Sequence, residues 1–234
     1  MKKIFTNIVY LNRDIDISRK EATENHLKEH GLSAVRFSAI ESDLQEYLVQ
    51  PMDSIRLNKP QISCLISHLE IIRRYGQQDL LVLEDDVDLS VLRKWPITFT
   101  DLLETLPSEV GIVQLFHFPL QHQIKPVRWF PGMFSTVAYF ITKKYSNHLV
   151  NTGYVNGKWD LSALKSKYVQ VVADSVLYSN TLTMSLPMIG LRDEVSNIFP
   201  NATYGKQSSE EFKRLWAGTI PNKETLLSQI KNFK

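Results

Sequence analysis

The chain has 234 residues, of which 43% are hydrophobic and 22% are charged, a composition typical of globular proteins and not of long disordered chains. Its 27 basic and 25 acidic residues are mixed along the sequence and leave a net charge of +2, which argues against the concentrated basic stripe of a nucleic-acid-binding protein. The single cysteine, Cys64, has no partner for an internal disulfide, which predicts a reducing, cytoplasmic location.

The first part of the chain alternates between strand-like and helix-like segments. In chain order these are a strand over residues 4–11, a helix from Ser18 to about His30, a strand over 34–40, a helix over 61–75 and a strand over 80–83. The first helix has capping-box spacing between Ser18 and Glu21, and the second ends at Gly76. This β-α-β-α-β order predicts an α/β fold with a mostly parallel central sheet flanked by helices.

The second half of the chain is less regular. It contains predicted strands over residues 111–116, 135–141 and 169–172, a predicted helix over 143–151, and loop residues over 118–131. The sequence has no internal repeat and no evident linker, so we predict one domain over residues 1–234. The patterning weakens from about residue 200, which leaves a C-terminal appendage over 200–234 as the alternative.

The most informative segment is an apolar strand that runs directly into a group of acids. Residues 80–83 (Leu-Leu-Val-Leu) are followed by Glu84, Asp85 and Asp86, and Asp88 comes two positions later. In an open α/β sheet, ligands bind beyond the carboxyl ends of the strands. Adjacent carboxylates repel each other there, and a divalent cation would remove the repulsion and bind diphosphate oxygens. A strand that continued through the cluster would point Glu84 and Asp86 to one side and Asp85 to the other.

Two other interpretations compete with a metal site. An acidic turn that caps a helix near residues 91–95 would leave the carboxylates solvated beside the positive helix end. The phospho-acceptor pocket of receiver domains also combines an apolar strand with paired acids. There the acids follow the first strand of a shorter domain, whereas here they follow the third predicted strand. The position along the chain therefore argues against the receiver pocket and leaves the capped turn open.

Blocks of residues along the chain resemble glycosyltransferase family 25, which contains the lipopolysaccharide and lipooligosaccharide galactosyltransferases and the related collagen galactosyltransferases. Residues 9–13 (Val-Tyr-Leu-Asn-Arg) are similar to the family's opening strand, and residues 62–68 (Ile-Ser-Cys-Leu-Ile-Ser-His) to its small-Cys-x-x-Ser-His helix. Residues 83–87 (Leu-Glu-Asp-Asp-Val) resemble its Glu-Asp-Asp strand end. Residues 135–144 resemble its Gly-Thr-x-x-Tyr strand with the basic turn that follows, and residues 173–178 its Val-Asp-x-x-x-Tyr/Phe segment.

The resemblance spans about residues 8 to 190, and the blocks occur in the family's order. It implies a GT-A-like nucleotide-sugar-binding fold, a nucleotide-sugar donor, a divalent metal (manganese, or magnesium in its place) and inversion at the anomeric carbon. The departures are Ser135 where the family has glycine, and Asn197 where it has an acid. The chain also has no histidine after His148, so it lacks the late histidine metal ligand of many GT-A enzymes.

Within this pattern Asp86 is the expected metal ligand, and Glu84 or Asp88 is its expected partner; the sequence leaves that choice open. A metal held there would neutralise the charge that develops on the leaving nucleoside diphosphate. Glu84 is also expected to contact the donor. Asp85 is expected either to contact the ribose of the donor or to brace a neighbouring loop.

Asn12, Arg13 and His68 are the remaining candidate donor-binding residues. Asn12 and Arg13 end the first predicted strand, where they would meet the nucleotide base or ribose, and an ordinary turn is the competing interpretation. His68 lies on the predicted helix over residues 61–75. A buried structural histidine is as compatible with that position as a donor contact.

Transfer with inversion needs a base on the acceptor side, and a carboxylate with a raised pKa suits this role. Asp174 is the first candidate because it falls in a matched block after a short apolar strand; the competing interpretation is an N-cap for the turn over residues 175–178. Asp160 is the reserve candidate, and the neighbouring Trp159 could stack on a sugar. Trp129 and Trp159 are equally compatible with packing in the core.

The sequence therefore predicts a transferase that moves a hexose, with galactose expected, from a uridine-diphosphate donor to a hydroxyl of a glycan or glycoprotein, as in lipopolysaccharide-type glycan assembly. Two alternatives remain: the same fold using another nucleotide sugar on a viral or surface glycoprotein, and a non-catalytic nucleotide-sugar-binding module. No nucleic-acid partner is expected. The amphipathic segment over residues 224–234 would either touch an anionic membrane surface or pack against the domain, and its two lysines, Lys231 and Lys234, favour packing.

Overall fold

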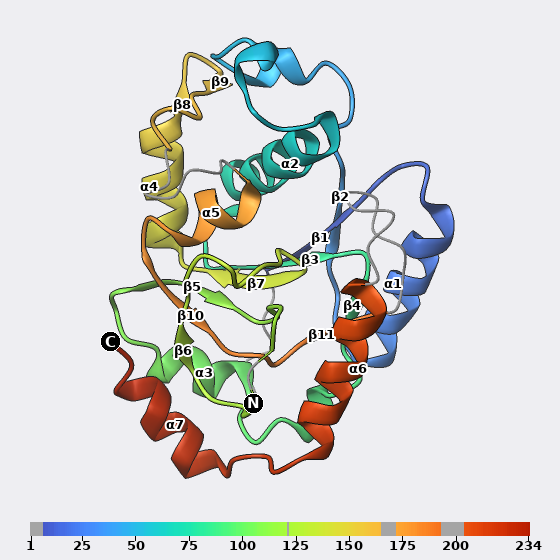
Figure 1. Ribbon diagram of the computed structural model, residues 1–234, viewed down its shortest axis with the longest axis vertical. Coiled ribbons are helices and arrows are strands. Elements are labelled where there is room, and N and C mark those ends of the chain that lie inside the picture. Colours follow the sequence, from blue (N-terminus) through green and yellow to red (C-terminus); the bar gives the residue numbers. More distant parts are fainter. Residues whose placement is uncertain (1–6, 121, 165–171, 193–203) are drawn as a thin grey trace.

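A computed structural model describes residues 7–120, 122–164, 172–192 and 204–234. Its central sheet has seven strands in the order β2-β1-β3-β7-β5-β10-β6 (Figure 1). These strands are β1 (Ile8–Asn12), β2 (Val35–Ser38), β3 (Leu80–Glu84), β5 (Val110–Gln114), β6 (Val127–Arg128), β7 (Ala138–Ile141) and β10 (Leu182–Ser185). Two further pairs are β4 (Val87–Asp88) with β11 (Gly190–Leu191), and β8 (Tyr154–Val155) with β9 (Lys158–Trp159).

The central sheet is mixed. β1 pairs in parallel with β2 and β3, and β5 pairs in parallel with β10. In contrast, β7 is antiparallel to both β3 and β5, and β6 is antiparallel to β10. The predicted α/β fold is confirmed: β1, β2, β3, β5 and β10 run in one direction, and β7 and β6 run in the opposite direction. A parallel return needs a crossover that is usually helical, and the described residues between β5 and β7 contain no helix.

β1, β3, β5 and β10 point the same way, and β1 and β3 end in candidate site residues. β5 is antiparallel to β7, which is antiparallel to β3, so β5 and β10 share the direction of β1 and β3. Their carboxyl ends therefore meet at one edge of the sheet. Glu84 is the last residue of β3, so the acidic cluster lies at this edge, where open α/β sheets bind ligands.

Helices cover both faces of the sheet (Figure 1). They are α1 (Ile17–Glu29), α2 (Lys59–Tyr75), α3 (Phe99–Thr105), α4 (Lys143–Gly153), α5 (Ala173–Tyr178), α6 (Tyr204–Ala217) and α7 (Lys223–Lys231), with short 3-10 helices η1 (Leu44–Tyr47), η2 (Met52–Ser54) and η3 (Leu92–Lys94). Buried side chains of α2, α4 and α5 pack on one face, and those of α1, α3, α6 and α7 pack on the other. Alternate residues of β3 serve the two cores: Val82 belongs to the first, and Leu81 and Leu83 belong to the second.

The two helices beside the candidate site begin earlier than predicted. α1 follows Asp16, so Ser18 and Glu21 lie inside the helix, and the predicted capping box is wrong. α2 begins at Lys59 because Asn58 caps it: the Asn58 side chain accepts a hydrogen bond from the Gln61 backbone N–H at 2.9 Å, and Gln61 accepts one from the Asn58 N–H at 3.1 Å. The predicted end of α2 at Gly76 agrees with the structure.

Strand limits also differ from the predictions. β7 begins at Ala138 because Ser135 has a φ of 120°, which an extended strand does not adopt. Of the predicted strand over 169–172, only Val172 is described, and it caps α5. Residues 4–6 of the first predicted strand and Asn197 lie outside the described residues.

The C-terminal helices belong to a core of the central sheet. Phe212 and Trp216 of α6 and Leu226 and Ile230 of α7 are at most 2% exposed, and they pack in the same cluster as Leu81 of β3. α6 lies along β11, and α7 lies along α3. The segment expected as an alternative appendage is therefore packed on the sheet, and α7 uses its apolar face for packing. No helix within the described ranges combines the length and apolar character needed to cross a membrane.

Candidate functional site

A cavity of about 450 Å³ lies at the carboxyl ends of β1 and β3. Glu84, Asp85 and Asp86 line it together with Asn12 and Arg13, so five of the candidate residues meet in one space. The other lining residues are Leu11, Arg19, Ala39, Glu41, Lys59, Pro60, Ser63, Cys64 and Ser67. Ligand pockets span about 300–1,000 Å³, so this cavity has the size of a small-molecule site.

The acidic cluster forms a turn at the cavity wall. β3 ends at Glu84, Asp85 and Asp86 make the turn, and the chain enters β4 at Val87. The strand does not continue through the cluster, so the condition for alternating side chains is not met, and all three acids line the same cavity. The alternative of an acid-capped helix is also wrong, because η3 has Val91 at its N-terminal cap and no side-chain cap.

Asp85 braces this turn against β1 and α1. One carboxylate oxygen, Oδ2, accepts a hydrogen bond from Asn12 Nδ2 at 2.7 Å, and the other, Oδ1, accepts one from the Arg19 guanidinium. The Asp85 backbone oxygen accepts from Thr23 Oγ1 at 2.7 Å and from the Arg192 guanidinium. Burial raises the pKa of Asp85 above its ordinary value, against the opposing charge of Arg19. Of the two expected roles, these contacts support bracing.

Arg19, in the first turn of α1, is a counter-charge for the acidic turn. Its Nη2 atom lies 3.2 Å from Asp86 Oδ2 and also contacts Asp85. The Asp86 side chain is 15% exposed at the cavity wall. A guanidinium within the fold thus reduces part of the repulsion between the carboxylates. The Arg192 guanidinium also reaches this turn, at the Asp85 backbone oxygen. The carboxylate oxygens at the cavity wall are of the kind that ligate a divalent cation.

Asp88 faces a different environment. It does not line the cavity; its Oδ1 atom accepts a hydrogen bond from the Ser90 N–H at 2.8 Å and lies 3.6 Å from His26 Nε2. Burial alone would raise the pKa of Asp88, but the contacts with His26 and Ser90 outweigh it and lower this pKa to about 2. Of the two expected partners of Asp86, the structure brings Glu84 to the cavity and leaves Asp88 outside it.

Glu84 is held between α2 and the segment before β7. Its Oε1 atom accepts a hydrogen bond from Thr136 Oγ1 at 2.5 Å and lies 3.3 Å from His68 Nε2. Burial alone would raise the pKa of Glu84, but the bonds to His68 and Thr136 lower it, so this carboxyl is ionised. The other ring nitrogen of His68, Nδ1, lies 3.1 Å from Tyr139 Oη. His68 is fully buried and outside the cavity lining, and it orients Glu84.

The small-Cys-x-x-Ser-His block of α2 forms one wall of the cavity. Ser63 Oγ donates a hydrogen bond to the Ile40 oxygen at 2.6 Å, and Ser67 Oγ accepts one from the Ile40 N–H at 2.9 Å. These two bonds fix the chain that follows β2. The next positions of the helix, Cys64 and His68, lie one turn apart and face the end of β3.

Asn12 and Arg13 both line the cavity, but they differ in how far their side chains are already engaged by other residues of the protein. The Asn12 side chain donates to Asp85 Oδ2 and accepts from Arg36 Nε at 2.9 Å, so its polar atoms are used inside the protein. Arg13 Nε donates to Glu41 Oε1 at 2.7 Å, and the Arg13 side chain is 30% exposed. Arg13 is therefore better placed than Asn12 to contact a ligand.

Asp174 is joined to the acidic turn through the segment before β7. The Ser135 N–H donates to Asp174 Oδ1 at 2.8 Å, and the next residue, Thr136, holds Glu84. Asp174 itself does not line the cavity. Burial raises its pKa to about 6 despite the bond from Ser135. The alternative role as an N-cap is wrong, because Val172 caps α5 and Asp174 lies in its first turn.

Ser135 replaces the glycine of the sequence pattern that residues 135–144 resemble. Its φ of 120° is in the region that favours glycine. The Ser135 oxygen accepts hydrogen bonds from Gln114 Nε2 and Tyr178 Oη, each at 3.0 Å, and its N–H donates to Asp174. These bonds hold a strained serine in the backbone shape that glycine adopts more readily.

Asp160 and the two tryptophans lie outside the cavity. Asp160 Oδ1 accepts a hydrogen bond from the Ser162 N–H at 2.9 Å and caps a turn. Trp159 is fully buried, and its Nε1 donates to Glu70 Oε1 at 3.0 Å, so of its two interpretations the structure supports packing in the core. Trp129 is 8% exposed and donates to a backbone oxygen at 2.9 Å. Both tryptophans are core residues.

Several cavity residues were not predicted as site residues: Arg19, Glu41, Lys59 and Cys64. Arg19 and Lys59 lie in the first turns of α1 and α2. Helix N-termini commonly bind anions, so a position in the first turn of a predicted helix is the signal that could have identified them. Glu41 comes from an irregular connection and has no comparable signal.

Comparison with known proteins identifies a family. The family profile described as "Glycosyltransferase family 25 (LPS biosynthesis protein)" matches residues 4–156. No curated protein sequence matches the chain. Among solved structures, the chain is similar to A197 from STIV, with 10% identity, a TM-score of 0.41 and coverage of 80% of this chain and 84% of the other. It is also similar to a glycosyltransferase involved in the glycosylation of the major capsid of PBCV-1, with 12% identity, a TM-score of 0.34 and coverage of 62% and 66%.

Proposed function

Because the chain belongs to glycosyltransferase family 25, we propose that it is an inverting, metal-dependent enzyme that transfers a hexose from a uridine-diphosphate donor to a hydroxyl of a glycan or glycoprotein. The observation that carries the proposal is the cavity at the carboxyl ends of β1 and β3, whose wall includes the turn Glu84-Asp85-Asp86. Galactose is the expected hexose because the sequence blocks resemble those of galactosyltransferases.

The oxygen atoms of Asp86 and Glu84 fit a divalent cation. Both side chains line the cavity, and the hydrogen bonds of Glu84 to Thr136 and His68 end on Oε1, which leaves its Oε2 atom for another ligand. Carboxylate oxygens are the ligands that manganese and magnesium prefer. A bound cation would neutralise the charge that develops on the leaving diphosphate.

The basic residues of the cavity wall suit the donor's diphosphate. Arg13, Arg19 and Lys59 line the same space as the acidic turn. Guanidinium and ammonium groups make strong, charge-assisted hydrogen bonds to phosphate oxygens. We assign Arg13 to the nucleotide because its side chain is 30% exposed, and Asn12 and Asp85 to the support of the turn, because they bond to each other at 2.7 Å.

Transfer requires a base that takes the proton of the acceptor hydroxyl, and we assign this role to Asp174. A carboxyl with a pKa of about 6 is largely ionised at neutral pH and still has affinity for a proton, which are the properties of an effective general base. Consecutive residues, Ser135 and Thr136, hold Asp174 and Glu84. The proposed base and the proposed metal ligand therefore belong to one connected group of side chains.

A panel of nucleotide sugars tests this function directly. The purified protein is incubated with each sugar and manganese in the absence of acceptor, and nucleotide release is measured by chromatography. We expect slow hydrolysis of uridine-diphosphate galactose that stops when the metal is chelated. Hydrolysis of a different sugar would correct the donor, and binding without hydrolysis of any sugar would indicate a non-catalytic module. Absence of both binding and hydrolysis across the panel would contradict the proposal.

A further inference from the structure

We propose that Cys64, His68 and Glu84 form a zinc-binding site at the wall of the cavity, and that zinc bound there competes with the cation of the sugar donor. The three residues offer one sulfur, one nitrogen and one oxygen ligand. Zinc binds such mixed sets, whereas magnesium and manganese prefer oxygen ligands alone. The competition rests on the proposed function, because it requires a donor cation at Glu84. The zinc site itself does not depend on that function.

The spacing of the ligand atoms fits a tetrahedral ion. All three lie within 4.8 Å of one another, and His68 Nε2 is 3.3 Å from Glu84 Oε1. Zinc–nitrogen and zinc–oxygen bonds of about 2.0–2.2 Å at a tetrahedral angle place the two ligand atoms about 3.4 Å apart. Two of the three ligands therefore already have the separation that zinc requires. Cys64 and Glu84 line the cavity, so the ion can enter from there and keep its fourth position for water.

The surroundings of His68 allow its Nε2 atom to bind a metal. The other nitrogen, Nδ1, lies 3.1 Å from Tyr139 Oη, and a hydroxyl can accept a hydrogen bond as well as donate one. In the metal-free protein the Nε2 proton faces the ionised Glu84 carboxylate; zinc would take the place of that proton, and the ring would then carry its proton on Nδ1. Metal-ligating histidines usually donate their second ring N–H to such a partner, which fixes the ring. The Cys64 thiol loses its proton when it binds zinc as a thiolate.

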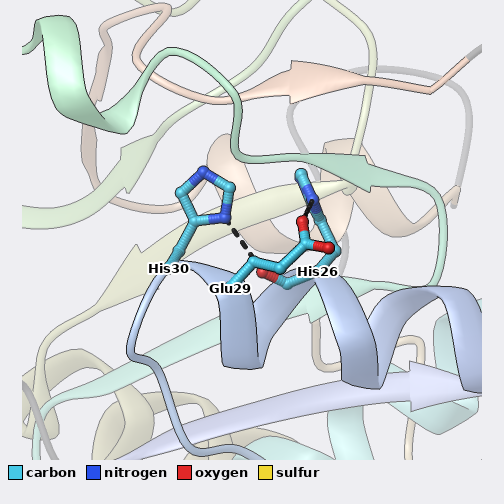
Figure 2. A group of neighbouring side chains, drawn as sticks. All are labelled: His26, Glu29 and His30. Carbon is cyan, nitrogen blue, oxygen red and sulfur yellow. Dashed lines mark hydrogen bonds and ion pairs between the residues drawn. The ribbon is translucent and has the colours of Figure 1, made fainter.

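A second group of potential ligands lies on α1 and provides a comparison. Figure 2 shows His26, Glu29 and His30 on this helix, with the hydrogen bond from His30 Nδ1 to the His26 oxygen. The Leu89 N–H donates to His26 Nε2 at 2.7 Å, so a neutral His26 carries its proton on Nδ1. Neither nitrogen of His26 then has a lone pair to offer a metal. The hydrogen bonds of this group therefore oppose ligation, whereas those of His68 permit it.

Zinc at the proposed site would disturb the carboxylate that is proposed to hold the donor cation. Zinc would bind Glu84 through Oε1, the atom nearest His68, and would place a second positive charge beside the Oε2 atom assigned to the donor cation, so the two cations would repel each other. We therefore expect zinc to weaken the binding of manganese and uridine diphosphate. Zinc would then inhibit the binding of the sugar donor.

Cobalt binding to the metal-free, full-length protein tests the site. Cobalt replaces zinc in sites of this kind and gives a near-ultraviolet charge-transfer band when a thiolate binds it. Because Cys64 is the only cysteine in the sequence, such a band can come from no other residue. We expect a band that saturates at equimolar cobalt, that zinc abolishes and that is absent in Cys64→Ser. His68→Ala and Glu84→Gln should each weaken cobalt binding at least about tenfold.

The His30→Ala variant is the matched control and should retain the band with wild-type affinity. No band in the wild-type protein would overturn the proposal. It would also be overturned if the band kept its affinity in both His68→Ala and Glu84→Gln, or were lost in His30→Ala. Circular dichroism shows whether each variant is folded, and zinc displacement of cobalt in the wild-type protein needs no variant. A cobalt band that manganese and uridine diphosphate leave unchanged would retain the zinc site and contradict the competition.

Discussion

Replacement of Asp86 by asparagine is expected to weaken manganese-dependent binding of uridine diphosphate by at least about 100-fold and to stop sugar transfer. Loss of an outer-shell partner alone costs about 10–100-fold in metal affinity or activity, and Asp86 is the proposed direct ligand. Its side chain lines the cavity and lies 3.2 Å from the Arg19 guanidinium. Calorimetry of nucleotide binding and a transfer assay on the same preparation measure both effects.

Asp88→Asn is the matched comparison for this prediction. Asp86 and Asp88 form a literal Asp-x-Asp in the sequence, but Asp88 lies outside the cavity lining and contacts His26 and Ser90. We expect Asp88→Asn to lower the thermal stability while nucleotide affinity remains near that of the wild type. If Asp88→Asn loses nucleotide binding and Asp86→Asn keeps it, the assignment of the metal ligands is wrong.

Asp174→Asn is expected to lower the transfer rate by about 10²–10⁴-fold, the usual contribution of a general base. Asp174 is bonded to the Ser135 N–H and does not line the cavity, so uridine-diphosphate binding should change little. Steady-state kinetics together with calorimetry separate the two effects. Loss of nucleotide binding in Asp174→Asn would contradict its assignment as base.

The pH dependence of transfer provides a second test of Asp174. A base acts when ionised, and burial raises the pKa of Asp174 to about 6. We therefore expect kcat/KM to be constant above this pH and to fall about tenfold per pH unit below it. The residual rate of Asp174→Asn should lack this fall. Asp160→Asn is the comparison, because Asp160 caps a turn through Ser162; loss of transfer in that variant would make Asp160 the base.

The sequence was sufficient to locate the candidate site. An apolar strand that ends in acids puts the acids at the carboxyl edge of an α/β sheet, and the structure places Glu84, Asp85 and Asp86 in one cavity at that edge. The helix over residues 61–75 and its Cys64 and His68 were recognisable because apolar periodicity is a local property. Local patterns thus identified the elements that carry most of the candidate residues.

Contacts between distant segments were not predictable from these patterns. The antiparallel direction of β7 depends on the absence of a helical crossover among the described residues of the preceding connection. Arg19 neutralises part of the acidic turn because α1 passes beside β3, and no local motif encodes that contact. Glu84 and Asp88 were both candidates for the second metal ligand beside Asp86. Which of them reaches the cavity depends on the turn at Asp85, whereas the sequence was equally compatible with a continuing strand.

Titration of uridine diphosphate into the wild-type protein, with and without manganese, tests the central claim most directly. We expect saturable binding in the presence of manganese and at least about 100-fold weaker binding after chelation, because the carboxylates of the acidic turn repel a diphosphate unless a cation lies between them. Magnesium should substitute in part. Equal binding with and without metal, or no binding under either condition, would contradict a metal-dependent donor site at Glu84 and Asp86.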